Sequence, residues 1–317
     1  MSSTTSPEGE LLVGGQALIE GVMMRSPGAY GVAVRRPDGS MAFQRGKVNS
    51  LAKKYPFLKL PVLRGVAVLF QSLGIGIRAL NFSAEAAMAE VVEAAKVEAV
   101  PGTKEKSNWA IAGSMAVGLG FGAVVFLLLP LWLTQLAERF VFGGHLSNLA
   151  FNLVDGLLRA VFFLGYILVI SRMKDIHRVF QYHGAEHKVV FAYEKRLPLN
   201  VENARVQSRL HPRCGTSFLL FVLLVSILVF AFIPKAAPFL VKFGGRLLLV
   251  PVITGLSYEV LRFTAKHRAA PLFSLLVAPG LALQRITTQE PTDDMLEVAI
   301  AALEEALRED GLLEQAA

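Results

Sequence analysis

The sequence predicts a mainly α-helical membrane protein, a polytopic bundle of four transmembrane helices with a small cytoplasmic β-hairpin region. The first observation is composition: 53% of the 317 residues are hydrophobic and 18% are charged, and the mean hydropathy is +0.49. Soluble domains carry about 25% charged residues. The second observation is that several long apolar stretches are almost free of charge, as membrane-spanning helices require.

The N-terminal part of the chain is polar at first and then β-like. Residues 1–10 lack the basic-then-apolar order of a signal peptide, and we expect a disordered tail there. Residues 11–57 are expected to contain strands. Within them Pro37-Asp38-Gly39 is a turn sequence between two stretches, 31–35 and 41–45, and this pattern predicts a hairpin.

Residues 58–107 are expected to form an interfacial or re-entrant helix followed by a linker at 101–106. The stretch 60–81 is apolar, but Arg64 and Arg78 leave 13 uncharged residues between them. A hydrocarbon core of about 30 Å needs about 20 apolar residues. A helix on the membrane surface therefore fits this stretch better than a span.

Residues 108–268 are expected to form the membrane domain. Asp155 and Arg159 lie four residues apart in the second span and can neutralise each other on its bundle-facing side. Arg246 is expected to reach back to the membrane interface. The four predicted spans are 109–133, 148–171, 216–233 and about 243–263.

The basic residues predict which side of the membrane each segment occupies. Nine Lys or Arg fall within residues 172–213 of the long loop 172–215, whereas the loop 134–147 carries Arg139 alone. Loops rich in Lys and Arg stay in the cytoplasm, so four spans place both termini there. The C-terminal segment, 269–317, is expected to include a cytoplasmic amphipathic helix over 291–307.

The same distribution of charge predicts the partners of the chain. The net charge of +7 comes from Lys and Arg beside apolar segments, and no basic stretch is interleaved with aromatic residues. This pattern favours the lipid bilayer as partner and excludes a single-strand nucleic-acid groove. The single cysteine, Cys214, rules out an intrachain disulfide.

The segment 182–187 carries the chemistry. It contains H-x-x-E-H, the inverted zincin motif, formed by His183, Glu186 and His187. On a helix both imidazoles share one face and can reach one metal ion, while Glu186 can act as general base toward a water there. Taken alone, the motif is equally consistent with a solvated helix that happens to contain histidines.

Two further segments bring metal-type ligands to the same membrane face. His211 and Cys214 lie immediately before the third predicted span, and Glu259 lies near the cytoplasmic end of the fourth. Together with the motif they predict a divalent metal site, with zinc favoured.

Two ligand sets remain open. A closed set of His183, His187, His211 and Cys214 would be a structural zinc site, whereas His183, His187 and Glu259 would leave a fourth place open for catalysis. The position of Glu186 beside two ligands favours the open set.

Five separated segments resemble the YqhQ-type family of bacterial integral membrane proteins, described as metal-dependent enzymes of unestablished function. The segments are 14–25, 182–187, 211–217, 257–259 and 284–288, and the resemblance runs from about residue 11 to 305. It implies a bacterial inner-membrane location and a bound metal. It also marks Glu20 and Arg25 as a candidate functional surface, with a segment packed under the bundle as the alternative.

Two hypotheses for function follow. The leading hypothesis is a membrane-embedded metal-dependent hydrolase, with a peptidase as the favoured type, whose site lies at the cytoplasmic membrane face. Its substrate would be a membrane-bound peptide, lipid or protein. The alternative is a non-catalytic membrane scaffold or adaptor stabilised by a structural zinc site. A small transporter is less favoured because the sequence shows no internal repeat.

Overall fold

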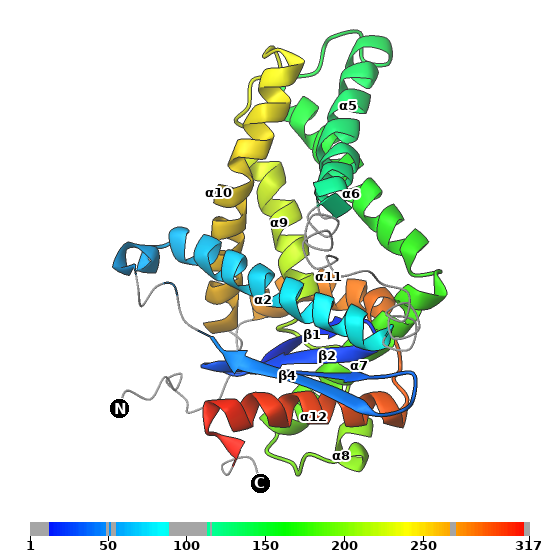
Figure 1. Ribbon diagram of the computed structural model, residues 1–317. Coiled ribbons are helices and arrows are strands. Elements are labelled where there is room, and N and C mark those ends of the chain that lie inside the picture. The colour runs from blue at the N-terminus through cyan, green and yellow to red at the C-terminus, as the bar shows by residue number, and fades with distance from the viewer. Residues whose placement is uncertain are drawn as a thin grey trace, which may run out of the picture.

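The computed structural model describes residues 13–48, 51, 55–88, 113–114, 116–266 and 271–313. The predicted tail at 1–10, the linker at 101–106 and the start of the first predicted span lie outside the described residues. A bundle of upright helices stands on a layered body made of a small sheet and the helices around it (Figure 1).

The sheet is an antiparallel meander of four strands in the order β1-β2-β3-β4. The predicted hairpin is confirmed, because β3 pairs with β4 from Ala29 opposite Lys47 to Arg35 opposite Met41. Two more strands, β1 and β2, precede it and pair from Gly14 opposite Arg25 to Leu18 opposite Gly21. The strands are β1 (Gly14–Leu18), β2 (Gly21–Arg25), β3 (Ala29–Arg35) and β4 (Met41–Lys47).

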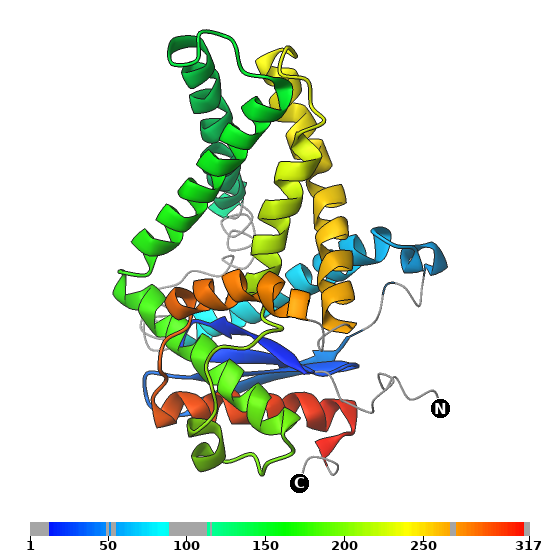
Figure 2. The same ribbon diagram turned by 180° about the vertical axis from the view of Figure 1, so that it is seen from behind.

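The central strands β2 and β3 are buried on both faces, because their side chains alternate between two separate cores. Val22, Met24 and Ala33 belong to a core shared with α7 (Lys174–Glu194) and α12 (Asp293–Asp310). Met23 and Val32 point the other way, into a core shared with α2 (Leu63–Ala87). The sheet therefore lies between α2 on one face and α7 with α12 on the other (Figures 1 and 2).

Helix α12 packs against β3 at close range. Its first turn carries Asp293 and Asp294, which suit the positive end of a helix dipole. The alanines on its buried face, Ala302 and Ala306, let the helix approach the strand so closely that a Cβ built on Gly31 would lie 2.4 Å from Ala306 N. The predicted amphipathic C-terminal helix is thus present, and it covers the sheet.

One group of helices stands upright above the sheet, and other helices lie across the base of this group (Figures 1 and 2). The upright group comprises a helix over Ala116–Phe140, which includes the π-helical turn η2 (Val124–Leu128) and α5 (Leu129–Phe140), together with α6 (Asn148–Ile170), α9 (Gly215–Phe230) and α10 (Phe239–Lys266). The crosswise helices are α2 and α11 (Pro271–Thr287). The short elements η1 (Pro56–Lys59) and α8 (Val201–Arg205) complete the described part of the chain.

The apolar helices differ in part from the predicted spans. Four helices of the described chain are long and apolar enough to cross a membrane: Leu63–Ala87, Ala116–Phe140, Asn148–Ile170 and Phe239–Phe263. The predicted span 216–233 corresponds instead to the shorter α9. Most of the stretch 60–81 lies in α2. This helix is long and apolar enough to cross a membrane, yet it runs crosswise to α9 and α10 (Figure 1).

A buried ion-pair network ties the upright helices together. Asp155 and Arg159 form the predicted pair on the inner side of α6. The expectation that Arg246 reaches the interface is wrong. Arg246 is fully buried and donates through NH1 to Asp155 Oδ1 at 2.5 Å. The ring of Phe230 lies 4.6 Å from the Arg159 guanidinium and 5.2 Å from that of Arg246, so one carboxylate and one aromatic face serve two cations.

The close approach of β3 to α12 predicts that Gly31→Ala destabilises the protein. The new methyl group would meet helix backbone, which cannot move aside, and overpacking of this kind costs about 1–3 kcal/mol of unfolding free energy. Thermal unfolding in detergent should show a lower Tm for this variant. Gly74→Ala in α2 is the control, because a Cβ there has no atom within 4 Å, and an unchanged or higher Tm is expected. Equal Tm values for Gly31→Ala and the wild type would contradict the packing described.

Candidate functional site

The H-x-x-E-H motif lies on the buried half of α7. The helix is interior from Tyr182 to Val190, except for the partly exposed His183. It can pack this closely because Gly184 has no side chain: a Cβ there would lie 2.0 Å from the carbonyl oxygen of Gln289. His183 and His187 lie one turn apart on the same face, and their ring centroids are 4.4 Å apart.

A second segment brings Cys214 to these rings. Cys214 is the N-cap of α9, and its sulfur accepts from the N–H of Thr216 at 3.4 Å and from the Thr216 hydroxyl at 3.3 Å. The loop before it is fixed by Gln284 of α11, which bonds both the N–H and the carbonyl of His211 at 2.7 and 2.8 Å. Cys214 Sγ lies 3.1 Å from His183 Nε2.

These three residues form a group that can hold a metal ion, here called the ligand triad: His183, His187 and Cys214. One ligand atom from each lies within 4.8 Å of the others. Both imidazoles donate Nδ1–H to backbone carbonyls, His183 to Thr287 at 2.8 Å and His187 to Arg209 at 2.5 Å. Carbonyls only accept, so Nε2 of each ring carries the lone pair. Metal-binding histidines are oriented in this way.

The electrostatics of the triad match this arrangement. Burial lowers the pKa of His187, so its ring is neutral and able to act as a ligand at neutral pH. The nearby Cys214 side chain opposes this effect and raises the pKa of His187, but burial is the larger of the two.

Glu186 lies beside the triad and completes the polar cluster. Its Oε2 is 3.9 Å from His183 Nε2 and 3.6 Å from His187 Nε2. Burial raises the pKa of this carboxyl group, against the opposing effects of His183, His211 and a hydrogen bond from the N–H of Gly15. A Cβ on Gly15 would lie 2.8 Å from Glu186 Cγ, so strand β1 closes directly over the carboxylate.

His211 lies next to the triad but is engaged elsewhere. Its ring centroid is 5.6 Å from that of His187. Its Nδ1 accepts from the N–H of Arg213 at 3.3 Å, and its Nε2 lies 3.2 Å from Glu194 Oε1. Glu194 also forms an ion pair with the Arg213 side chain. The structure therefore places His211 in a neighbouring His–Glu–Arg group and does not bring it to the metal-binding position.

Glu259 is not brought to the triad either. Its carboxylate pairs with Arg64 of α2, from Nε to Oε1 at 2.6 Å and through a second, NH2 contact. It also accepts from the N–H of Val62 at 3.3 Å. Glu259 thus joins α10 to the start of α2, and the His₂Glu ligand set that the sequence favoured has no counterpart in this geometry.

The two charged residues of the N-terminal motif have separate places. Glu20 sits in the β1–β2 turn and pairs with Arg178 of α7 at 2.6 and 2.5 Å, while the Tyr182 hydroxyl donates to it at 3.3 Å. It attaches the sheet to α7. Arg25 instead lies in a pocket, where its NH1 donates to Ser72 Oγ at 3.1 Å, and burial lowers its pKa.

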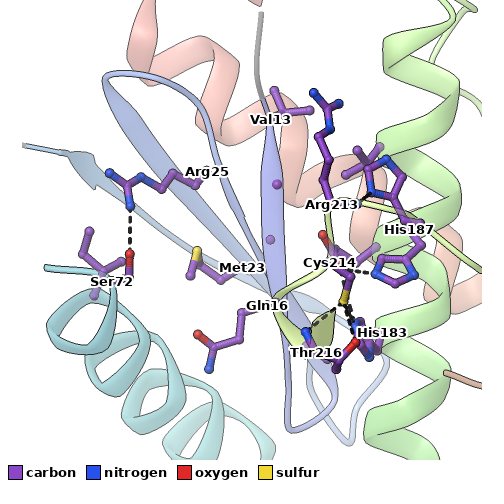
Figure 3. Close-up of a pocket in the computed structure, with 18 of the residues that line it drawn as sticks. Val13, Gln16, Met23, Arg25, Ser72, His183, His187, Arg213, Cys214 and Thr216 are labelled. Atoms are coloured by element: carbon purple, nitrogen blue, oxygen red, sulfur yellow. Dashed lines mark hydrogen bonds and ion pairs between the residues drawn. The ribbon is translucent and has the colours of Figure 1, made fainter. Parts of the chain in front are cut away.

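The pocket extends from the triad to Arg25 and has a volume of about 680 Å³ (Figure 3). Strands β1 and β2, helices α2 and α7 and the start of α9 build its wall. The polar lining residues include Gln16, Arg25, Ser26, Ser72, His183, Glu186, His187, His211, Arg213, Cys214 and Thr216. The larger apolar ones are Val13, Met23, Ile75, Val179, Phe180, Val190 and Leu219.

Several functional contacts had no individual signal in the sequence. The carbonyls of Thr287 and Arg209 that orient the histidines are backbone groups, which any residue would supply. Glu194 lies seven residues after His187, on the same face of α7, and this spacing could have indicated it. Gly15 belongs to a glycine pair in the N-terminal motif, but its contact with Glu186 depends on tertiary packing.

The comparisons with known proteins agree with the resemblance seen in the sequence. A family model described as "Protein of unknown function (DUF1385)" matches residues 60–309. The chain is 40% identical over 306 residues to "Uncharacterized protein YqhQ" of Bacillus subtilis (strain 168). The aligned residues cover 95% of this chain and 94% of that protein. No solved structure matches the chain. The chain belongs to this family of unknown function.

The geometry predicts that Cys214 and Glu259 respond differently to substitution. Cys214→Ala removes a ligand atom and should weaken zinc binding by more than the roughly 10–100-fold that loss of an outer partner costs. Glu259→Gln should leave zinc affinity unchanged, because its partner is Arg64. Competition titration of the purified variants against a zinc chelator measures both. Loss of zinc in a folded Glu259→Gln protein would contradict the separation of the two groups.

Proposed function

We propose that this chain is a membrane-embedded, metal-dependent hydrolase with its site at the cytoplasmic face of the bacterial inner membrane. The observation that carries the proposal is the convergence of two Nδ1-anchored imidazoles and one thiol beside a buried carboxylate. The donor set suits zinc, which binds nitrogen at 2.0–2.1 Å and sulfur at about 2.3 Å. Two such ligands lie roughly 3.5 Å apart, close to the 3.1 Å between His183 Nε2 and Cys214 Sγ.

The placement in a membrane is supported by the surface of the upright helices. Large apolar side chains are exposed along them, among them Leu157 (66%), Val161 (58%), Val169 (69%), Leu228 (68%) and Leu248 (79%). A water-soluble surface rarely carries so many. The paired charges of these helices, such as Asp155 and Arg246, are inside, where a membrane protein must keep them.

The orientation is supported by the arrangement of the ends. The sheet, α12 and the basic segment 172–213 all lie at the same end of the upright helices (Figure 1). Four crossings return the chain to the side on which it started, and basic segments stay in the cytoplasm. Both terminal segments are therefore assigned to the cytoplasm. Helices α2 and α11 lie across this end (Figure 1), which suits a position at the membrane surface.

His183, His187 and Cys214 would hold the ion, and three protein ligands are the number found in catalytic zinc sites. When bound, a divalent ion would supply a Lewis acid and lower the pKa of a water molecule beside it. Glu186 would be the general base, and its raised pKa makes its carboxylate a stronger base than an exposed one. The Gly15 N–H and the walls of the pocket hold this carboxylate in place.

A second candidate is a non-catalytic scaffold in which the metal links α7 to the start of α9. Cys214 and His187 belong to these two elements and would hold the loop between them. The open side of the triad and the presence of Glu186 there favour the hydrolase. In the scaffold, Glu186 would have no role beyond packing.

Metal content separates these candidates. Purified wild-type protein in detergent should contain about one zinc per chain, and His187→Ala should lose it because a ligand is removed. Glu186→Gln should keep the zinc and lose hydrolysis by about 10²–10⁴-fold. His177→Ala is the matched control, since His177 is an exposed histidine on the same helix. A folded wild-type protein that binds no divalent metal would refute the proposal, and an active Glu186→Gln would refute the role of the carboxylate.

A further inference from the structure

Arg25 is a cation in the pocket wall with no acidic partner within the described part of the chain. The other arginine of the pocket wall, Arg213, is neutralised by Glu194. The interaction of Arg25 with Ser72 Oγ, at 3.1 Å, is with a neutral hydroxyl. Its Nε and NH2 groups make no hydrogen bond to the residues that the structure describes, which leaves two donors of the planar fork unused.

Burial of an unpaired guanidinium in this wall is costly. The side chain is partly buried, and burial lowers its pKa. A charged group that is taken from water without a counter-ion destabilises the fold unless a ligand supplies that counter-ion. Ser72 of α2 holds the guanidinium of Arg25 in a fixed position. The guanidinium is therefore already oriented before a ligand binds.

The unused donors lie at the far end of the pocket from the triad. Figure 3 shows Arg25 and Ser72 on one side, His183, His187 and Cys214 on the other, and Gln16 and Met23 between them. The pocket between these ends carries larger apolar side chains from four elements: Met23 of β2, Ile75 of α2, Val179, Phe180 and Val190 of α7, and Leu219 of α9. A ligand that fits has an anionic group at one end, a hydrolysable bond at the other and apolar parts along the wall.

We propose that Arg25, positioned by Ser72, binds the phosphate group of an anionic membrane phospholipid, which is the substrate class of this site. The inference rests on the proposed hydrolase function and specifies its substrate. Arginine matches phosphate through two parallel N–H donors, and the Nε and NH2 groups of Arg25 can provide them. A phospholipid also accounts for the apolar wall contributed by α2 and α9, the helices that border the predicted membrane surface.

Binding tests this without any turnover. Isothermal titration in nonionic detergent would compare dioctanoyl phosphatidylglycerol, dioctanoylglycerol, which has the same chains but no phosphate, and inorganic phosphate, each with a chelator present so that no metal contributes. Wild type should bind the anionic lipid at least about 10-fold more tightly than dioctanoylglycerol, the effect of one charge-assisted pair. Arg25→Gln should abolish that preference, and Arg25→Lys should retain part of it.

Two further variants keep the test decisive. Arg45→Gln is the matched control, because Arg45 is an exposed arginine paired with Glu305 outside the pocket, and it should bind lipid like wild type. Ser72→Ala keeps the charge but frees the guanidinium, and it should weaken the anionic lipid by about 3-fold, the loss of one neutral hydrogen bond. It also carries the test if Arg25→Gln fails to fold.

The outcomes separate this proposal from the hydrolase. An unchanged lipid preference in folded Arg25→Gln, or in Ser72→Ala where Arg25→Gln does not fold, would overturn the subsite while a normal zinc content leaves the hydrolase standing. An Arg25-dependent preference in a wild-type protein that never binds metal would support the subsite and refute the hydrolase. Inorganic phosphate that binds as tightly as the lipid would overturn the phospholipid as ligand, and point to a soluble phosphate compound.

Discussion

Burial of polar side chains is the constraint on which the arrangement of this protein depends. Glu186 and His187 are both enclosed, and each would destabilise the fold if left without a partner. Their partners come from remote parts of the chain. Gly15 lies in the first strand, Arg209 in the loop before α9, and Thr287, which holds His183, at the end of α11. The terminal segments must therefore wrap around α7 for the cluster to exist.

The same constraint organises the upright helices. Asp155 is enclosed between Arg159 and Arg246, and the three belong to α6 and α10. A carboxylate between two cations fixes how these helices face each other, since removal of Asp155 would leave two buried guanidinium groups without a counter-ion. An unpaired charge in such a network costs more free energy in a low-dielectric environment, where no water solvates it. Below the helices, the pair of Arg64 with Glu259 does the same for α2 and α10.

The general architecture was predictable because it follows from patterns that are local in the sequence. Apolar runs predicted the upright helices, Pro37-Asp38-Gly39 predicted the β3–β4 hairpin, and acidic residues at 293 and 294 predicted the start of α12. Strands β1 and β2 were not delimited, because β1 begins with two glycines and β2 is buried on both faces, so neither shows the alternation that identifies a strand. The orientation of α2 depends on its contacts with the sheet and with α10, which no local pattern records.

The candidate site was predictable in part for the same reason. His183 and His187 share a helix face by spacing alone, and Cys214 could be placed at the right depth by its position before α9. Glu259 and His211 were also predicted at the same depth in the membrane as the two histidines, but an equal depth does not mean that the side chains are close together. Each has a closer partner, Arg64 for Glu259 and Glu194 for His211, and these pairings are set by packing between helices.

Because His211 and Glu259 do not belong to the group that converges, the candidate site differs from both predicted ligand sets. His211 Nε2 lies 3.2 Å from Glu194 Oε1 and Glu259 pairs with Arg64, so the ligand atoms of three residues converge where the sequence allowed a closed set of four or a different set of three. In a closed structural site a protein side chain would be the fourth ligand, and no adjoining pocket would be needed. Here the triad opens onto a cavity of about 680 Å³, and Glu186 lies between the ligands and the strand that covers them. Under the proposed function, these three residues would hold the metal, Glu186 would be the base and Arg25 would bind the anionic part of the substrate, whereas a structural metal site would need neither Glu186 nor Arg25.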